Sequence, residues 1–340
     1  DLGRNPLWSR FPETFGEDTY ITTRLGTAAI QGYEGDGLDA LTAVASCMKH
    51  YVGYSVPENG KDRTPAYIPD VVLWQHHLPP FEAAVKAGAS TIMINSASIN
   101  GMPAHASKYL LTDVLRGRFG FEGLVVSDWE DVIRLHTRHR MAESPREAVR
   151  LAVEAGLDMS MVPHDFSFAD HLVDLVRKGD IPEERVDRSV AIILRLKMEL
   201  GLFENPYAEP GAVANFGLPA YQKLALDAAR ESMTLVKNRD GVLPLAKDAR
   251  ILLAGPAAMN LGPLHGSWSY TWQGDKEEAY PEDTLTLQEA LLDTSGTARV
   301  QPVAASGFDN EVNYDAARLA EAAAEADAIV LALGEPAYAE

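Results

Sequence analysis

The sequence predicts an α/β fold made of two successive units, and three observations predict it. Short apolar runs alternate with helical patterns from about residue 45 to residue 205, as in parallel sheets whose strands are joined by helices. The run 123–127 (GLVVS) places three large apolar residues in succession, which is typical of a strand buried on both faces. The stretch 205–220 is rich in proline and glycine and predicts a linker. We therefore expect a first domain at 1–205, a linker at 206–220 and a second domain at 221–340.

The first domain is expected to begin with a loop and then to alternate strands and helices. Residues 1–20 are polar and crowded with charge, so they form either a solvated surface or the wall of a polar pocket. Pro79-Pro80 should kink or restart the helix that contains them, and Ser144-Pro145-Arg146-Glu147 has the residues of a helix N-terminus. The expected helices are 21–33, 71–86, 110–118, 144–156, 172–178 and 186–201; the expected strands are 45–53, 90–95, 123–127 and 157–162, with a loop at 54–67.

The second domain repeats the alternation of helix and strand. An alanine-rich helix at 315–326, most simply a packed crossover, leads to a strand at 328–333, after which Gly334-Glu335 follows. The other expected elements are a helix at 221–236, a turn at 238–241, a strand at 250–254 and an irregular loop of Gly, Trp and Tyr at 255–274.

The charge and composition of the chain exclude several classes of function. The 340 residues carry a net charge of −19, which disfavours nucleic acids and anionic membrane surfaces and suits a neutral or cationic ligand. Cys47 is the single cysteine, which excludes an internal disulfide framework and a cysteine-based zinc site. No apolar run approaches the roughly 20 residues of a membrane span. We expect no nucleic-acid partner, no membrane partner, no cofactor and no catalytic metal.

Polar side chains stand at the ends of four expected strands. They are Lys49-His50, Asn95-Ser96, Asp128-Trp129 and Gly334-Glu335. In barrels of alternating strands and helices, catalytic side chains project from the C-terminal ends of the strands. Asp128 and Glu335 would supply the nucleophile and the proton donor that cleavage of a glycosidic bond requires. The alternative is that Asp128 caps the next helix and that Trp129 belongs to the core.

Other side chains are candidates for binding a sugar. Arg10, Lys49 and His50 are able to donate hydrogen bonds to sugar hydroxyls, and Ser96 is a further candidate. Trp129 and Trp268 offer flat faces to the C–H bonds of a sugar ring.

A metal site and a dinucleotide-binding loop are the alternatives to a sugar-binding site. The histidines raise the alternative of a metal site, but they show no regular ligand spacing. The glycines at 255, 262 and 266 follow a strand, yet they lack the G-x-G-x-x-G spacing of a dinucleotide loop. The histidines concerned are His76, His77, His136, His139 and His164.

Five stretches of sequence occur together in a specific order. They are NPLWSRFPETFGED (5–18), CMKHYVGY (47–54), GLVVSDWED (123–131), SWSYTWQG (267–274) and LALGEPAY (331–338). This combination resembles glycoside hydrolase family 3, in particular its β-glucosidase and exo-β-glucanase members. The resemblance implies a (β/α)8-like TIM barrel, partial in this chain, followed by an α/β sandwich domain, with the active site between them.

The resemblance also implies roles for the candidate residues. Asp128 is the implied nucleophile of a retaining mechanism, and Glu335, from the second domain, is the implied acid/base. Because the acid/base position varies within the family, Glu340 stays an alternative to Glu335. The loop 53–63 contains no histidine, which argues against the N-acetylglucosaminidase branch, whose acid/base is a histidine in that loop.

The same matching implies how the sugars are held. Arg10, Lys49 and His50 correspond to family residues that hold the hydroxyls of the first-subsite sugar. Trp129 and Trp268 correspond to aromatics that flank the sugars, with Trp268 on the leaving-group side.

The chain is expected to be a piece of a longer enzyme. A full barrel takes about 250 residues and eight strands, and only about half of those strands are found before the linker. The family's early segment, with a carboxylate that binds the first-subsite sugar, should precede Asp1. An intact mass of 37.0 kDa for the purified protein would contradict this expectation.

The leading hypothesis is a retaining, exo-acting β-glucosidase that hydrolyses terminal non-reducing β-D-glucosyl residues. Its expected ligands are glucose, cello-oligosaccharides and aryl β-glucosides, together with the rest of a longer polypeptide as the partner that completes both domains. The alternatives are a β-xylosidase of the same family and a non-catalytic sugar-binding homologue. By the same resemblance we expect a periplasmic or secreted location rather than a cytoplasmic one.

Overall fold

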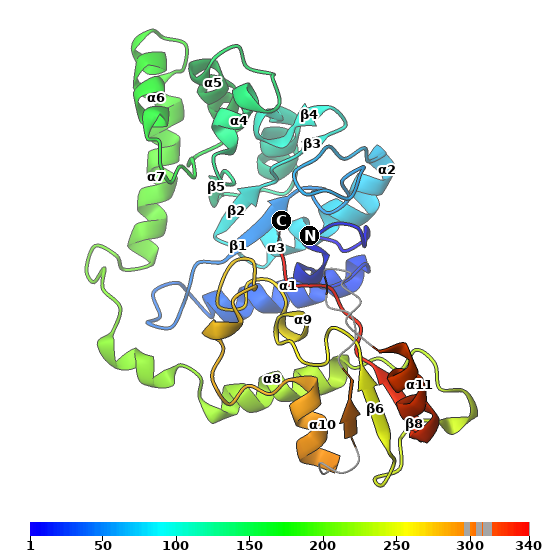
Figure 1. Cartoon of the computed structure of the whole chain (residues 1–340). Helices are drawn as coiled ribbons and strands as arrows, with labels where there is room; N and C mark the ends of the chain where they lie inside the picture. The colour runs from blue at the N-terminus through cyan, green and yellow to red at the C-terminus, as the bar shows by residue number, and fades with distance from the viewer. Residues whose placement is uncertain (296–299, 304–307, 309–314, 340) are drawn as a thin grey trace. The chain divides into compact units, whose positions relative to one another are not determined.

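A parallel sheet of three strands lies at the centre of the first unit, in the order β1-β2-β5. β1 spans Cys47–Tyr51, β2 spans Thr91–Ile94 and β5 spans Leu124–Val126. All three residues of β5 are buried, as predicted for a strand whose two faces are covered. The computed structural model in Figure 1 describes residues 1–295, 300–303, 308 and 315–339, and it divides into two units, Asp1–Tyr207 and Ala208–Glu340.

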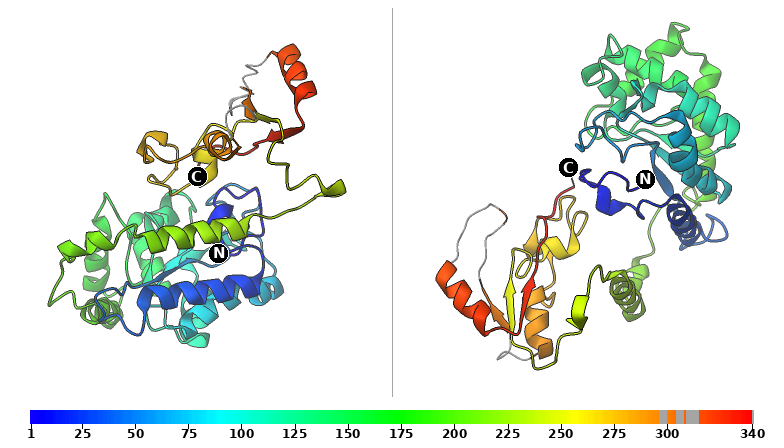
Figure 2. Two further views of the ribbon diagram at one scale, coloured as in Figure 1. Left: turned by 90° about the horizontal axis from the view of Figure 1, so that it is seen from below. Right: turned by 90° about the vertical axis from the view of Figure 1, so that its right-hand side faces the viewer.

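Helices pack around this sheet and against one another. α1 (Thr19–Glu34) lies against α3 (Leu78–Lys86), as Figures 1 and 2 show. α5 (Pro145–Ala155) contacts both α4 (Asp131–Thr137) and α6 (Ser167–Arg177). The expected helix start at Ser144 is confirmed, because its hydroxyl accepts the N–H of Glu147.

One hydrophobic core joins the strands and helices of the first unit. Ile92 from β2, Val125 from β5 and Ala152 from α5 are wholly buried within it. α7 (Glu183–Glu199) contacts β5, and part of the apolar face of this helix remains exposed. The centre of the unit is therefore a packed sheet, from whose strand ends the polar side chains extend.

The helix expected at 71–86 restarts at its two prolines, as predicted. α2 (Asp70–Val72) continues into a π-helical turn at Leu73–His77. α3 then begins at Leu78 with Pro79 and Pro80 in its first turn, where backbone N–H groups have no helical acceptor to lose.

The helix expected at 110–118 is found as Tyr109–Arg118 and is wound as a π-helix. At its end the N–H of Phe119 bonds the carbonyl of Val114, five residues back. The patterns did not predict α4 or the small antiparallel pair of β3 (Ser98–Ile99) and β4 (Met102–Pro103).

The strand expected at 157–162 is wrong, since one isolated bridge between Val126 and Met159 is all the strand pairing this segment has. Asp158 supplies the physical reason. Its carboxylate accepts the N–H of Val125 at 3.0 Å and the hydroxyl of Ser189 at 2.7 Å. A side chain therefore takes the place of a ladder hydrogen bond, and the segment lies beside β5 without forming a strand.

A second parallel sheet, in the order β7-β6-β8, lies at the centre of the second unit. β6 spans Ile251–Ala254, β7 spans Val300–Pro302 and β8 spans Ala328–Leu331. The expected alanine-rich helix is confirmed as α11 (Ala316–Glu325), whose N-terminus is capped by the carboxylate of Asp315.

The remaining helices of the second unit differ in detail from the expected ones. α8 (Pro219–Ser232) ends before residue 236, because Met233 adopts an extended backbone conformation. A short helix, α9 (Gly262–His265), interrupts the loop expected at 255–274. The sequence patterns did not predict α10 (Leu287–Ser295) or β7. Among the helices in the described parts of the chain, none has both the length and the apolar character needed to cross a bilayer.

Candidate active site

Asp128 lies two residues beyond the C-terminal end of β5, after Ser127, and is 6% exposed. The hydroxyl of Ser96 donates to its Oδ2 at 2.8 Å, and the N–H of Trp129 donates to its Oδ1 at 2.5 Å. The two structural alternatives are wrong: the N-cap of α4 is Glu130, not Asp128, and Trp129 is 44% exposed rather than part of the core. The carboxylate is thus held at both oxygens beside an accessible indole ring.

The surroundings of Asp128 favour its ionised form. Burial by itself raises the pKa of the Asp128 carboxyl, whereas the His50 ring, the Trp129 N–H, the Ser96 hydroxyl and the Arg63 guanidinium lower it; the net pKa lies below the usual value of an aspartate. Hydrogen bonds to the charged form are the usual means of keeping a buried carboxylate ionised.

His50 lies against Asp128 from within β1. Its Nε2 is 3.9 Å from Asp128 Oδ2, and its Nδ1 is 2.8 Å from the carboxylate Oδ2 of Asp1. Burial, reinforced by the positive charge of Arg10, lowers the pKa of the His50 ring well below its ordinary value. The 3.9 Å separation is too long for a hydrogen bond, so His50 contacts Asp128 without bonding it.

Arg10 and His50 both lie against the aromatic ring of Tyr54. The guanidinium carbon of Arg10 lies 5.8 Å from the centre of that ring, and the His50 ring is centred 4.9 Å from it. Arg10 also makes a bidentate ion pair with Glu13, at 2.8 and 2.9 Å. Burial lowers the pKa of Arg10, but the hydrogen bonds that it donates to Glu13 and the charge of that carboxylate raise the pKa more. The guanidinium therefore stays charged.

Lys49, next to the buried His50, is an exposed residue. Residues 49 and 50 were expected at a strand end, but both lie inside β1, which continues to Tyr51, paired there with Ile94 after a shift of register. Lys49 is exposed, and its carbonyl accepts the amine of Asp1 at 3.1 Å. Lys49 is therefore a more solvent-exposed candidate than the buried His50.

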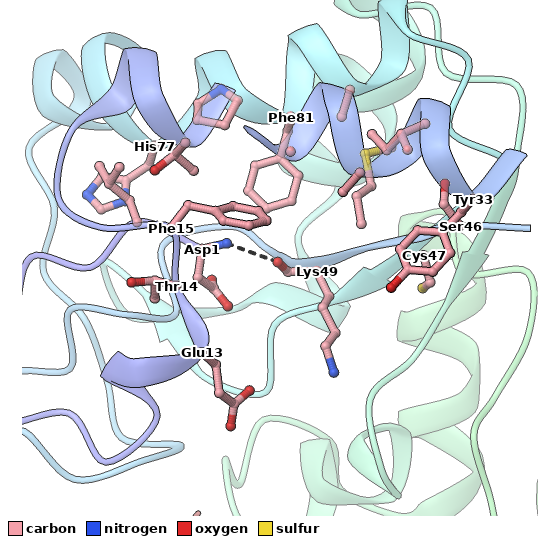
Figure 3. Close-up of a pocket in the computed structure, with 18 of the residues that line it drawn as sticks. Asp1, Glu13, Thr14, Phe15, Tyr33, Ser46, Cys47, Lys49, His77 and Phe81 are labelled. Carbon is pink, nitrogen blue, oxygen red and sulfur yellow. Dashed lines mark hydrogen bonds between the residues drawn. The ribbon is translucent and has the colours of Figure 1, made fainter. Parts of the chain in front are cut away.

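Figure 3 shows a mainly apolar hollow of about 350 Å³ beside Lys49. Phe15, Tyr33 and Phe81 line it, with Glu13 and Lys49 at its polar side. Asp128 is not among its lining residues. Asp1, which bonds His50, is among the lining residues, so the hollow adjoins the surroundings of the candidate nucleophile without including Asp128 itself.

Residues that the sequence patterns did not single out complete the surroundings of Asp128. The N–H of Asp128 donates to Nε2 of His105 at 3.3 Å, and burial lowers the pKa of that ring. Arg63 donates to the Ser96 hydroxyl at 2.9 Å, and Asp1 bonds His50. These residues come from loops without strand or helix periodicity, so no local pattern identified them.

Trp268 lies in the second unit, in a loop that presents two indoles. Trp268 is 55% exposed, and the Trp272 ring is centred 6.5 Å from it. The Trp268 backbone has φ 65° and its N–H bonds the carbonyl of Trp272. Trp272 belongs to the same motif, SWSYTWQG, whose pattern did not distinguish it as a site residue.

Glu335 is exposed and lies beyond the end of the second sheet. The expected strand at 328–333 ends at Leu331, so Glu335 does not follow the strand directly. Its Oε2 accepts the hydroxyl of Tyr338 at 2.8 Å. The N–H of Ala339 bonds Oε1 of Gln273, which ties this segment to the tryptophan loop of the same unit. Glu340, the alternative acid/base, lies outside the described residues.

The histidines considered for a metal site are dispersed. His136 bonds the carbonyl of Ala142, His164 lies edge-on to Trp129 and His76 bonds Arg4. Within the described ranges, no group of three or more His, Cys, Asp or Glu side chains is arranged to hold a metal ion.

Comparison with known proteins places the chain in a family. Residues 1–196 match the glycosyl hydrolase family 3 N terminal domain, and residues 233–340 match the glycosyl hydrolase family 3 C-terminal domain. The lysosomal beta glucosidase of Dictyostelium discoideum is 43% identical over 356 residues, covering 100% of this chain and 43% of that protein. A putative beta-xylosidase of Formosa agariphila is 41% identical over 266 residues, covering 75% of this chain and 34% of that protein.

A solved structure gives the same result. The crystal structure of a beta-glucosidase from Listeria innocua in complex with glucose matches with a TM-score of 0.87 at 33% identity, covering 99% of this chain and 45% of that chain. The chain spans less than half the length of each of these relatives. The resemblance found in the five sequence stretches is confirmed, and the chain belongs to glycosyl hydrolase family 3, with a TIM-barrel-like N-terminal domain followed by the family's C-terminal domain.

Proposed function

We propose that this chain carries the catalytic carboxylates of a retaining, exo-acting β-glucosidase that hydrolyses terminal non-reducing β-D-glucosyl residues. The observation that carries the proposal is Asp128, a buried carboxylate held ionised at the end of β5 by donors to both of its oxygens. Relatives named as beta-glucosidases support the choice of substrate.

The proposed reaction has two steps. Asp128 attacks the anomeric carbon while Glu335 gives a proton to the leaving oxygen, so the glycosidic bond breaks and a glycosyl–aspartate bond forms. Glu335 then removes a proton from water, which attacks the same carbon and releases Asp128 as a carboxylate. Retention requires the two carboxyl groups to be about 5–5.5 Å apart in the working enzyme.

The sugar in the first subsite is proposed to lie against the groups around Asp128. Arg10, His50 and Ser96 lie in its buried polar surroundings, whereas Lys49 would reach the sugar from its exposed position. Trp129 offers an exposed indole face beside the nucleophile. Trp268 is proposed to flank the leaving group, and the neighbouring Trp272 presents a second indole in the same loop.

A β-xylosidase is the second candidate, because relatives with that name are 41% and 35% identical to this chain. The two sugars differ by the hydroxymethyl group at C5, so comparing kcat/KM for aryl β-glucoside and aryl β-xyloside distinguishes the candidates. The names of two relatives also support a location outside the cytoplasm, since one protein is called lysosomal and the other periplasmic.

Replacement of Asp128 tests the proposal in the intact protein. Asp128→Ala should abolish turnover of an aryl β-glucoside, whereas Asp165→Ala, which removes an exposed aspartate, should leave turnover unchanged. Azide added to Asp128→Ala should restore slow turnover and give the α-glucosyl azide, because an external nucleophile then attacks from the vacant face. Near-normal turnover by Asp128→Ala would eliminate the assignment. Glucose binding by the wild-type protein without hydrolysis would favour a non-catalytic sugar-binding homologue.

The acid/base is tested separately. Glu335→Ala should slow aryl glucosides with poor leaving groups far more than those with good ones, because good leaving groups need no proton. Azide should then yield the β-glucosyl azide. If Glu340→Ala shows this behaviour and Glu335→Ala does not, the role belongs to Glu340.

A further inference from the structure

A hydrogen-bonded relay connects Arg63 to the candidate nucleophile. Nη1 of Arg63 lies 2.9 Å from the Ser96 hydroxyl oxygen, and that oxygen lies 2.8 Å from Asp128 Oδ2. A guanidinium has donors only, so the Ser96 oxygen accepts from Arg63. The single proton of the hydroxyl is therefore directed to Asp128, and the orientation of the Ser96 O–H is determined by Arg63.

The relay is enclosed and its parts are held in place. Ser96 is 0% exposed, and the side chain of Arg63 is 16% exposed. Arg63 has φ 60°, a left-handed conformation that is uncommon for a residue with a side chain. Its neighbour Asp62 anchors the loop, because its two carboxylate oxygens accept the indole N–H of Trp8 and the hydroxyl of Tyr54, both at 2.6 Å.

Unlike an ordinary surface ion pair, this arrangement determines the orientation of the Ser96 hydroxyl that bonds Asp128. The charge of Arg63 lowers the pKa of Asp128, and Arg63 also strengthens the hydrogen bond from Ser96 to the carboxylate by polarising the O–H. The other oxygen of Asp128 is held by the Trp129 N–H. Removing Arg63 therefore leaves the hydroxyl free to rotate while the rest of the site stays in contact.

We propose that Arg63 is a positioning residue for the catalytic reaction, acting through the Ser96 hydroxyl to orient the Asp128 carboxylate; this inference rests on the proposed function of Asp128. In the first step the relay holds the attacking carboxylate in line with the anomeric carbon. In the second step the same hydroxyl stabilises the negative charge that returns to Asp128 when the glycosyl–aspartate bond breaks. No group of the substrate needs to contact Arg63 for this role.

Other titratable or charged groups also face Asp128, so the test must separate Arg63 from them. His50 from β1 and His105 from the turn at 104–106 face Asp128, and Asp131 and Arg134 from α4 act in turn on His105. Arg63 acts on Asp128 through its charge and through the hydrogen bond to the Ser96 hydroxyl. A double-mutant cycle on Arg63 and Ser96 isolates the part that passes through this hydrogen bond.

The kinetic test uses the intact protein, an aryl β-glucoside and the variants Arg63→Met, Arg63→Lys, Ser96→Ala and the Arg63→Met/Ser96→Ala pair. Arg63→Met should lower kcat/KM roughly tenfold to a hundredfold, as expected for the loss of a hydrogen bond that involves a charged group. The acid limb of its pH–rate profile should move to higher pH, and Arg63→Lys should restore part of the loss. In the Ser96→Ala background, Arg63→Met should have a smaller effect than in the wild type, because only the action of its charge remains. Arg140→Met is the control, because Arg140 is also left-handed (φ 55°) but exposed.

Two results of the kinetic test would overturn the inference. One is an Arg63→Met enzyme with wild-type kcat/KM and an unmoved acid limb; the other is an equal effect of Arg63→Met with and without Ser96. A 13C-NMR titration of the Asp128 carboxyl, assigned by its loss in Asp128→Asn, needs no turnover. It should show a higher pKa in Ser96→Ala and in Arg63→Lys than in the wild type, and an unchanged value would contradict the relay. Full turnover by Asp128→Ala would instead refute the proposed function, while the titration still decides whether Arg63 acts on Asp128.

Discussion

Burial lowers the pKa of several histidines in the first unit, namely His50, His77, His105 and His139. For His77 the pKa falls from 6.5 to about 4. Between these values the unfolded chain binds a proton at residue 77 that the folded chain does not bind. The stability contributed by the neutral ring is therefore complete above pH 6.5 and is lost as the pH falls towards 4.

Replacing His77 by glutamine should make the stability of the protein less dependent on pH in this range. Urea unfolding at pH 7, 5.5 and 4.5 should show a smaller loss of the free energy of unfolding than in the wild type, by on the order of 3 kcal/mol for the full shift. His164→Gln, at an exposed histidine, is the control. Parallel pH curves for wild type and His77→Gln would contradict the prediction.

At the level of elements, Asp158 connects β5 to two helical segments. Its Oδ2 accepts from Arg116 at 2.6 Å as well as from the N–H of Val125, and its Oδ1 accepts from Ser189 in α7. The Asp158 side chain is only 3% exposed. Since Asp128 lies two residues beyond β5, these bonds hold the strand that precedes the proposed nucleophile.

Asp158→Ala should lower the free energy of unfolding by about 3–5 kcal/mol, because it leaves Arg116 partly buried without its carboxylate. Asp174→Ala is the matched control: it removes a carboxylate at the surface that is paired with Arg146 and should lower the free energy of unfolding far less than Asp158→Ala. Urea unfolding measures both. Equal losses for the two variants would show that Asp158 has no special role in holding β5.

At the level of the whole molecule, we propose domain limits at 1–205 and 221–340, joined by a linker at 206–220. Tyr207 and Phe216 in this linker are 81% and 92% exposed. Its short helical turn, Pro210–Asn215, buries no residue. Such exposed segments are the preferred sites of proteolysis in native proteins.

Brief chymotrypsin treatment of the native protein should therefore cut first at Tyr207 or Phe216. Mass spectrometry of the earliest fragments identifies the cleavage sites, and Phe81, which is buried, serves as an internal comparison. First cuts between residues 47 and 199 would contradict the proposed limits. Because Asp128 and Glu335 lie on opposite sides of this linker, separation of the two fragments should also abolish hydrolysis.

The sequence by itself determined the features that depend on neighbouring residues. The buried run of β5, the N-cap at Ser144 and the helix restart at Pro79-Pro80 were predicted because each depends on backbone rules that operate within a few positions. Asp128 was predicted for the same reason, since it follows a recognisable strand. The family resemblance rests on similarly short stretches.

Tertiary structure alone decided which residues surround that carboxylate. Ser96 and Asp128 are 32 residues apart, Arg63 and Ser96 are 33 apart, and Asp1 and His50 are 49 apart. The expected strand at 157–162 does not form, because the Asp158 carboxylate accepts the N–H of Val125. The periodicity of the sequence does not predict such a bond. Periodicity reports which face of an element is buried, whereas the partner of a polar side chain depends on how distant segments are folded together.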